Sequence, residues 1–273
     1  MLRFLYRTVP GRMILKLLVR PGVSKAAGRF LASRASGWMV PYYIQKYKID
    51  MSDIKIPEGG FPSFNAFFTR TKKGEVCRKA ENELLSPCDG FLTPVGISKD
   101  TVLDIKHTQF SLEDLLKDRK LAEKFYDGTA LIFRLTPANY HRYCYAADGK
   151  IICGRKIRGK LHCVRPIAVR TLPVYTQNSR EYQVTRTENF GLVLQMEVGA
   201  LLVGKIKNHK KPLQSRDVWA AEEKGYFEFG GSTIIVLLQK DAVCVDESLY
   251  ERENEDGEIP VYMGESVAKS CVF

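Results

Sequence analysis

The sequence predicts an α+β fold with a largely antiparallel β core and amphipathic helices at its N-terminus. Two observations lead to this fold class. From Thr129 onward, short apolar or alternating runs are separated by Gly, Asn and charged residues, which is typical of strands and their turns. Before that, as far as Arg34, a cation interrupts the apolar residues every three to five positions, which indicates helices with one basic face.

The predicted helices can be justified in chain order. We expect two or three helices over residues 11–50, interrupted at Pro21-Gly22 and at Gly37, because Pro and Gly end helices. A linker at residues 57–60 precedes a short amphipathic helix over residues 64–70. Ser111 begins a further helix, since Asp114 three residues later completes a capping arrangement.

The strands follow from residue 129. They are predicted at residues 129–135, 182–187, 191–198, 201–206, 232–238 and 242–245. The acidic stretch at residues 251–258 is expected to be mobile or loop-like. The sequence contains no Gly-rich phosphate loop, internal repeat or low-complexity tract.

Length and charge divide the chain into two regions. With 273 residues, of which 45% are apolar and 27% charged, the chain suits one globular body with a sizeable core. The net charge of +11 is concentrated at residues 1–50, which hold ten Lys or Arg and one acid. We therefore predict a basic amphipathic helical segment at 1–50 and a main domain at 51–273.

The basic segment is expected to contact a membrane surface without crossing it. Its longest uncharged stretch, residues 35–45, has 11 residues and includes a proline, whereas a spanning helix needs about 20. Interleaved apolar and basic residues favour helices lying in the lipid interface. The apolar anchors would be Leu2, Phe4, Leu5, Met13, Ile14, Leu17 and Leu18. A helical cap with a solvated face and nucleic-acid binding are the alternatives, and the absence of a nucleic-acid motif disfavours the second.

The cysteines and histidines predict neither disulfides nor a metal site. The seven cysteines are Cys77, Cys88, Cys144, Cys153, Cys163, Cys244 and Cys271. Their number is odd, no two form a C-x-x-C pair and no secretory signal precedes them, so reduced thiols are expected. The histidines are His107, His141, His162 and His209, and their spacing is not that of zinc ligands.

The clearest candidate for chemistry is the corner before residues 232–238. Two glycines free the backbone ahead of Ser232, and the β-branched run behind it indicates a buried strand that holds the corner rigid. A serine hydroxyl attacks only when a base and a strained carbonyl assist it. Attack of Ser232 on the Gly231 carbonyl would be an N-to-O acyl shift, by which chains cut themselves. On these residues alone, a plain turn is the alternative.

Three other segments contain an acid, a histidine and an arginine that could assist a self-cleaving serine. Asp89 lies in a Pro-x-Asp-Gly turn, where an Asp often bonds only its own backbone. His141 stands among aromatic residues and alone would suit a packed structural histidine. Arg180 neighbours Glu181, as in a surface ion pair. Each segment has a structural explanation when it is taken singly.

Taken together, these segments resemble the phosphatidylserine decarboxylase family. The matching elements are Phe64-Asn65-x-Phe67-Phe68-Thr69-Arg70, Ser86-Pro87-x-Asp89-Gly90, Asn139-Tyr140-His141-Arg142, Val198-Gly199-Ala200-x-x-Val203-Gly204-Lys205-Ile206 and Phe229-Gly230-Gly231-Ser232-Thr233. The resemblance covers roughly residues 60–246. One element would be unspecific, but five in this order are not.

The resemblance implies a self-processing enzyme whose catalytic decarboxylase domain is residues 51–273. The chain would cut itself between Gly231 and Ser232 into a β chain (1–231) and an α chain (232–273), which stay associated. Ser232 would become a pyruvoyl cofactor that forms a Schiff base with phosphatidylserine. The carbonyl then serves as an electron sink while CO₂ leaves, and phosphatidylethanolamine is released for phospholipid biosynthesis.

The resemblance also implies partners and a location. The partners would be phosphatidylserine and an anionic membrane surface but no nucleic acid, and a homodimer is left open. The protein would lie peripherally on the cytoplasmic face of the cell membrane.

The implied roles follow from that chemistry. His141 is the first choice for the base that deprotonates Ser232 and for the later proton donor. Asp89 would fix the imidazole tautomer, by the logic of a Ser-His-Asp set. Arg142 and Arg180 would meet the substrate's carboxylate or phosphate, with structural ion pairs as the alternative.

One departure from the family pattern leaves the base open. Many members have a second histidine three residues after the Tyr-His pair, where this chain has Cys144, and a thiol is a poor base unless its pKa is lowered. Either His141 serves both steps or His162 supplies the missing imidazole. Arg165 also replaces an Asn that often precedes the proline, and we have no interpretation for this change.

Two other functions remain as alternatives. The chain could be a pyruvoyl-dependent decarboxylase of a soluble amino acid, although the basic apolar N-terminus argues against a soluble substrate. It could also be an unprocessed lipid-binding homologue, against which the intact Gly231-Ser232 pair and Asp89 argue.

Overall fold

A computed structural model of the chain confirms the α+β class with a mostly antiparallel β core. The structure describes residues 8, 10, 13, 21–74, 82–98, 103–105, 108–159, 174–199, 206–209, 216–228 and 232–271. Within this part of the chain, no helix is long and apolar enough to cross a bilayer.

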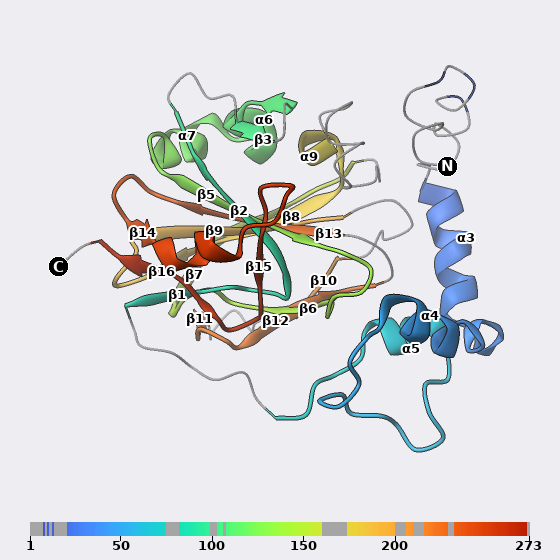
Figure 1. Cartoon of the computed structure of the whole chain (residues 1–273). Coiled ribbons are helices and arrows are strands. Elements are labelled where there is room, and N and C mark those ends of the chain that lie inside the picture. Colours follow the sequence, from blue (N-terminus) through green and yellow to red (C-terminus); the bar gives the residue numbers. More distant parts are fainter. Residues whose placement is uncertain are drawn as a thin grey trace.

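The centre of the molecule is an eight-stranded sheet in which every neighbouring pair is antiparallel (Figure 1). In spatial order its strands are β11 (Asp217–Val218), β7 (Gly149–Ile157), β8 (Arg180–Arg186), β9 (Leu192–Val198), β13 (Ser232–Leu238), β5 (Thr129–Leu135), β2 (Gly90–Gly96) and β15 (Ile259–Val261). Strand β13 is buried at all seven residues, because β9 and β5 flank it and both faces of the sheet are covered.

Three smaller sheets complete the β structure. One contains β10 (Ile206–Asn208), β12 (Glu223–Phe227) and β6 (Arg142–Cys144). A second contains β1 (Glu83–Leu85), β16 (Ser266–Ser270) and β14 (Val243–Val245), and the third pairs β3 (Leu103–Ile105) with β4 (Thr108–Phe110).

The helices form two groups. The N-terminal group contains α3 (Pro21–Ala32), η1 (Arg34–Ser36), α4 (Met39–Tyr47) and α5 (Phe64–Phe68), and lies to one side of the β structure (Figure 1). The second group contains α6 (Leu112–Leu116), α7 (Arg119–Ala122), η2 (Glu123–Phe125) and α9 (Val174–Gln177), and η3 (Glu247–Arg252) lies apart from both groups. As predicted, Ser111 caps α6, and its hydroxyl accepts from the main-chain N–H of Asp114 at 3.0 Å.

The two faces of the main sheet have separate cores. The face that carries Ile235 and Leu237 packs against α6 and η2, with Tyr175 of α9 in the same cluster. The face that carries Ile234 and Val236 packs against Tyr143 of β6 and Phe227 of β12. Since side chains alternate along a strand, Ser232 points to the same face as Ile234, toward the small sheet of β6, β10 and β12. We call this the Ser232 face.

The N-terminal helices share a third core, in which helices from both sides of residue 50 take part. It contains Leu31, Val40, Tyr43, Phe64, Phe67 and Phe68. Aromatic rings dominate it, and the Tyr43 and Phe64 rings meet edge to face at 4.9 Å. We call α3, η1, α4 and α5 the helical unit. A domain boundary at residue 50 stays a prediction.

A buried ion pair joins the main sheet to the small sheet. Lys224 occupies a bulge in β12, which turns its ammonium inward to Glu197 of β9, and both side chains are fully buried. Gln195 and Asn208 also bond the Glu197 carboxylate. Burial raises the pKa of Glu197 and lowers that of Lys224, while their mutual attraction opposes both shifts. The pair is therefore held by a satisfied polar network.

The predicted strands, cysteines and acidic stretch can be compared with the structure. The strands expected at 129–135 and 232–238 are confirmed residue for residue, whereas 201–205 lie outside the described part. The expectation of reduced thiols is wrong for Cys244 and Cys271, which form a disulfide between β14 and the end of β16. The acidic stretch is a loop between η3 and β15 rather than a free tail, because Glu258 is buried in a two-pronged ion pair with Arg134.

The buried pair yields a stability prediction. Lys224→Met leaves the Glu197 carboxylate buried and unpaired, so we expect the free energy of unfolding to fall by about 3–5 kcal/mol. The double variant Glu197→Leu/Lys224→Met removes both charges and should recover most of that loss. Urea unfolding of both in a Ser232→Ala background measures this, and equal destabilisation of the single and double variants would contradict it.

Candidate active site around Ser232

Ser232 is the first residue of β13 and is fully buried. In register it pairs with Leu135, the last residue of β5, while Thr233 pairs with Val198, the last of β9. Among the described residues, its Oγ atom has no hydrogen-bond partner. Buried hydroxyls are nearly always hydrogen-bonded, so an unpaired one at the end of a central strand marks a candidate reactive group.

His141 lies just before β6 and is also fully buried. Its ring stacks on Phe68 of α5, with ring centroids 3.9 Å apart. The Nδ1 atom is 2.8 Å from the carbonyl oxygen of Asn139. Because a carbonyl only accepts, Nδ1 carries the proton, and in the neutral ring Nε2 holds the basic lone pair.

Two short segments connect His141 to Ser232. Leu135, opposite Ser232, is followed by five residues and then His141. The main-chain N–H of Phe227 donates to the His141 carbonyl at 2.9 Å, and Phe227 is five residues before Ser232. His141 therefore flanks the sheet that covers the Ser232 face. The structure brings these two predicted residues to the same side of the molecule.

The loop that carries His141 is stiffened by its own side chains. The Asn139 amide oxygen accepts from the N–H of Thr136 at 2.7 Å and from its hydroxyl at 2.6 Å. This Asx-type arrangement fixes the turn and so fixes the carbonyl that holds His141. In this structure the Asn139 carbonyl therefore holds the proton on Nδ1 of His141. The expected role of Asp89 in fixing the tautomer stays a prediction.

Asp89 lies at the same end of the main sheet but is held differently. It precedes β2, and β5 separates β2 from β13, which puts Gly90 and Ser232 about 10 Å apart. Its carboxylate forms an ion pair with Lys72 at 3.0 Å and accepts from the N–H of Met263 at 2.8 Å. Asp89 thus does not merely bond its own turn. A catalytic role for it stays a proposal.

Cys144 is not a candidate base in this structure. It is fully buried in β6, and burial raises the pKa of its thiol to about 12. The Sγ atom is 3.8 Å from the Ser86 carbonyl oxygen, so the thiol donates a weak hydrogen bond. His162, the alternative base, lies outside the described residues. So does the Gly231 carbonyl, which Ser232 would attack.

The two arginines proposed for the substrate's anion have other partners. Arg180 is buried, and it donates from Nε, Nη1 and Nη2 to carbonyl oxygens of Leu115, Thr176, Asn178 and Asp114. Arg142 pairs with Glu223 at 2.8 Å and donates from Nε to the carbonyls of Thr69 and Arg70. Both side chains tie segments together. Arg142 does so through an ion pair, as in the structural alternative, whereas the surface pair expected for Arg180 is not formed, since Arg180 is buried on carbonyl oxygens and Glu181 pairs with Lys156.

Sequence reasoning assigned no role to two cations beside this site. Lys72 connects Asp89 to the loop that carries His141. Its ammonium pairs with Asp89 and also lies 4.9 Å from the Tyr140 ring centroid, and its main-chain N–H donates to the Tyr140 hydroxyl at 3.3 Å. Arg70 lies two residues after α5 and is buried beside Ala138 and Asn139. The sequence signals were that Arg70 closes the first of the five family motifs and that Lys72 follows two residues later.

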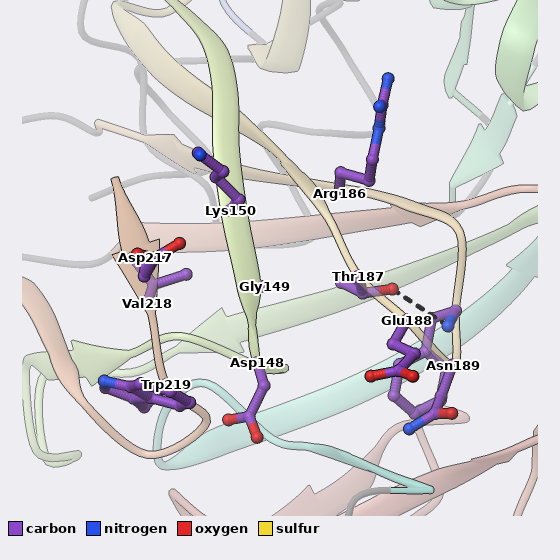
Figure 2. Close-up of a pocket in the computed structure, with 11 residues that line it drawn as sticks. Asp148, Gly149, Lys150, Arg186, Thr187, Glu188, Asn189, Asp217, Val218 and Trp219 are labelled. Atoms are coloured by element: carbon purple, nitrogen blue, oxygen red, sulfur yellow. Dashed lines mark hydrogen bonds between the residues drawn. The ribbon is translucent and has the colours of Figure 1, made fainter. Parts of the chain in front are cut away.

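A pocket of about 380 Å³ lies at the opposite end of the strands (Figure 2). Lys150 and Arg186, which pair in β7 and β8, line it together with Asp217 and Trp219. Its acidic and basic side chains are mixed, and it contains neither histidine nor cysteine. The candidate chemistry therefore stays at the Ser232 end. The described residues also contain no group of three potential metal ligands.

Comparison with known proteins finds relatives over nearly the whole chain. The sequence pattern of the phosphatidylserine decarboxylase family matches residues 64–269. The chain is 41% identical over 272 residues to phosphatidylserine decarboxylase proenzyme 2 of Clostridium acetobutylicum, covering 98% of this chain and 91% of that protein. It is 38% identical over 277 residues to the corresponding proenzyme of Ruminiclostridium cellulolyticum, covering 100% and 91%. With that of Fusobacterium nucleatum the identity is 37% over 270 residues, covering 97% and 89%.

The burial of Cys144 yields a prediction on the base. Because its thiol stays protonated at neutral pH, Cys144→Ala should leave the rate of backbone cleavage at Ser232 unchanged. His141→Gln should slow it by about 10²–10⁴, the usual contribution of a general base. Pulse-chase gels measure both rates, and His162→Ala run alongside shows whether the second histidine carries the step. Loss of cleavage in Cys144→Ala would contradict the assignment.

Proposed function

The chain belongs to the phosphatidylserine decarboxylase family of carboxy-lyases, and from this premise we propose that it cuts itself at Ser232 and then decarboxylates phosphatidylserine to phosphatidylethanolamine. The observation that carries the proposal is the buried Ser232 hydroxyl, which is unpaired among the described residues and begins the central strand on the side where His141 lies. The relatives' designation as proenzymes supports a precursor that is processed.

The cleavage uses groups that the chain already holds. His141 Nε2 accepts the proton of the Ser232 hydroxyl as Oγ bonds to the Gly231 carbonyl carbon. The amide C–N bond then breaks, which leaves an ester and a free amine on residue 232. Removal of the Cα proton expels the Gly231 carboxylate and leaves a dehydroalanine. Its tautomer is hydrolysed by water with loss of ammonia, which produces the pyruvoyl group.

The β ladder keeps the two fragments together after the cut. Residues 232–271 supply β13, which bonds β5 and β9 along its whole length. The same fragment supplies β15, which pairs with β2, and β16, which pairs with β1. The new chain end therefore stays at the Ser232 position while Gly231 is released from it.

The new carbonyl fits the surroundings of Ser232. The Ser232 side chain is fully buried in the uncut chain, and burial favours a neutral ketone over a charged group. Such a group supplies an electrophile for the substrate's amine and a sink for the electron pair left by CO₂. His141 Nε2, after taking up a proton, is our candidate to donate that proton to the carbon that loses CO₂, while Nδ1 stays bonded to the Asn139 carbonyl.

The helical unit supports peripheral binding to an anionic membrane, and we place the enzyme on the cytoplasmic face. Phe30, Trp38 and Tyr42 are large aromatic side chains that the unit leaves exposed, and Lys46 lies over the Tyr42 ring at 5.5 Å. Aromatic and basic residues side by side are typical of the lipid headgroup region. Of the seven predicted anchors, Met13 is described and exposed, and the others lie outside the described residues.

The cleavage is tested by mass. Purified wild-type protein should separate under denaturing conditions into a 231-residue piece and a 42-residue piece whose N-terminus is blocked to Edman degradation. Without denaturant the pieces should migrate as one species. Ser232→Ala removes the nucleophile and should give one 31.0 kDa chain without decarboxylase activity. An active, unbroken wild-type chain would refute the proposal, and an inactive, unbroken one would favour a lipid-binding homologue.

The membrane contact is tested on surface residues, since deleting residues 1–50 would also remove core residues of the helical unit. Trp38→Glu/Tyr42→Glu should weaken binding to vesicles of equimolar phosphatidylglycerol and phosphatidylcholine at least about tenfold, because two aromatic contacts are lost. Tyr250→Glu on η3 is the matched control. Undiminished vesicle binding by the double variant would rule out this surface.

A further inference from the structure

Arg70 is a buried arginine whose donors are only partly used. It is 5% exposed, and its guanidinium lies 4.9 Å from the Phe67 ring centroid. Only Nη2 has acceptors, the carbonyls of Ala138 and Asn139, at 3.4 Å each. The Nε and Nη1 atoms are enclosed and have no hydrogen-bond partner within the described part of the chain. Nearly all buried donors are paired, so two such atoms on one cation call for a partner.

The acids nearest to Arg70 do not provide it. Asp89 and Asp53 act on Arg70 electrostatically, but both carboxylates are paired with Lys72, at 3.0 and 3.9 Å. Burial lowers the pKa of Arg70, yet a guanidinium keeps its charge in proteins. A buried cation without a counter-ion is unfavourable. Among the described residues Arg70 therefore has no carboxylate of its own, and the site is complementary to an added anion.

The position of Arg70 links that anion to the candidate active site. The Asn139 carbonyl oxygen accepts from Arg70 Nη2 and also from Nδ1 of His141. One oxygen atom thus bridges the guanidinium and the imidazole. An anion on the remaining donors of Arg70 would lie beside the histidine that faces the reaction.

We propose that Arg70 binds the phosphodiester of the aminophospholipid substrate, an inference that rests on the proposed function. Nε–H and Nη1–H lie on opposite sides of the planar guanidinium, and each forms with Nη2–H a fork that matches two phosphate oxygens, so an anion at either free donor would share Nη2 with the two carbonyl oxygens at 3.4 Å. The substrate's carboxylate is the poorer match, because a cation that stabilises it before reaction would oppose the loss of CO₂. The phosphodiester keeps its charge from substrate to product, so Arg70 holds it throughout. Since Nε and Nη1 are enclosed in the uncut chain, the ligand reaches them when the helical unit shifts relative to residues 136–141.

The test separates maturation, binding and turnover. Arg70→Gln removes the charge, Arg70→Lys keeps it without the fork, and Arg34→Gln, an exposed arginine of the helical unit, is the matched control. Monomeric dihexanoyl phosphatidylserine serves as substrate, which avoids the membrane surface. Equilibrium binding of dihexanoyl phosphatidylethanolamine, which keeps the phosphodiester and lacks the carboxylate, gives a readout that needs no turnover.

We expect both Arg70 variants to cut themselves as the wild type does. In Arg70→Gln, KM should rise about 10- to 100-fold with kcat nearly unchanged, because hydrogen bonds to a charged group that persist through the reaction are lost. The affinity for the phosphatidylethanolamine should fall by the same factor. Arg70→Lys should fall between Arg70→Gln and the wild type, and Arg34→Gln should match the wild type.

Three results would overturn the inference. Unchanged KM and product affinity in a cleaved Arg70→Gln would show that Arg70 binds no substrate anion. A fall in kcat alone would assign it to the carboxylate. Failure of both Arg70 variants to cleave would make it a residue of folding or maturation. A wild-type protein that binds dihexanoyl phosphatidylethanolamine but does not decarboxylate would instead refute the proposed function. The difference in affinity for this lipid between the wild type and Arg70→Gln would then still show whether Arg70 binds the phosphodiester.

Discussion

The hydrogen-bond ladder on both sides of β13 is the constraint on which the rest of the molecule depends. A strand locked between two neighbours cannot shift its register, since a one-residue slip would turn every side chain to the opposite face. Ser232 therefore keeps its orientation although the glycines before it permit many. The same ladder would let the proposed cleavage break the peptide bond before the central strand without loss of the core, because the strand is held by its neighbours and not by the chain that precedes it.

The helical unit does more than lie beside the β structure. Tyr43 donates to the Pro137 carbonyl, Phe68 stacks on His141, and Arg142 reaches back to the carbonyls of Thr69 and Arg70. The segment with the exposed aromatic residues is thus also the segment that packs against the histidine loop. Anything that displaces the unit, including a lipid at its outer surface, must change the packing around the imidazole. The proposed membrane surface and the candidate active site therefore share one set of contacts.

How much the sequence predicted depended on whether the information was local. Continuous β-branched runs gave β5 and β13 their bounds, and the Ser111 cap located α6. The short strands β1 and β6 were missed because their partners are distant in sequence and supply the pattern. In the site, motif resemblance selected Ser232 and His141. It could not reveal that the Asn139 carbonyl holds the His141 ring or that Lys72 pairs with Asp89. Nor could it reveal that Arg70 has no carboxylate of its own among the described residues. Each of these depends on a neighbour far along the chain or on main-chain atoms.

The disulfide between Cys244 and Cys271 has a topological consequence. Both cysteines follow Ser232, so the bond closes a covalent ring inside the shorter fragment that includes η3 and β15. A crosslink across 27 residues lowers the entropy of the unfolded fragment, which corresponds to about 3.5 kcal/mol in the chain-entropy description. With its outer end joined to β14, β16 cannot separate completely from β14 while the bond is intact. If the chain is cut at Ser232 as proposed, the shorter fragment therefore holds a covalently closed ring from Cys244 to Cys271 and is not an open chain.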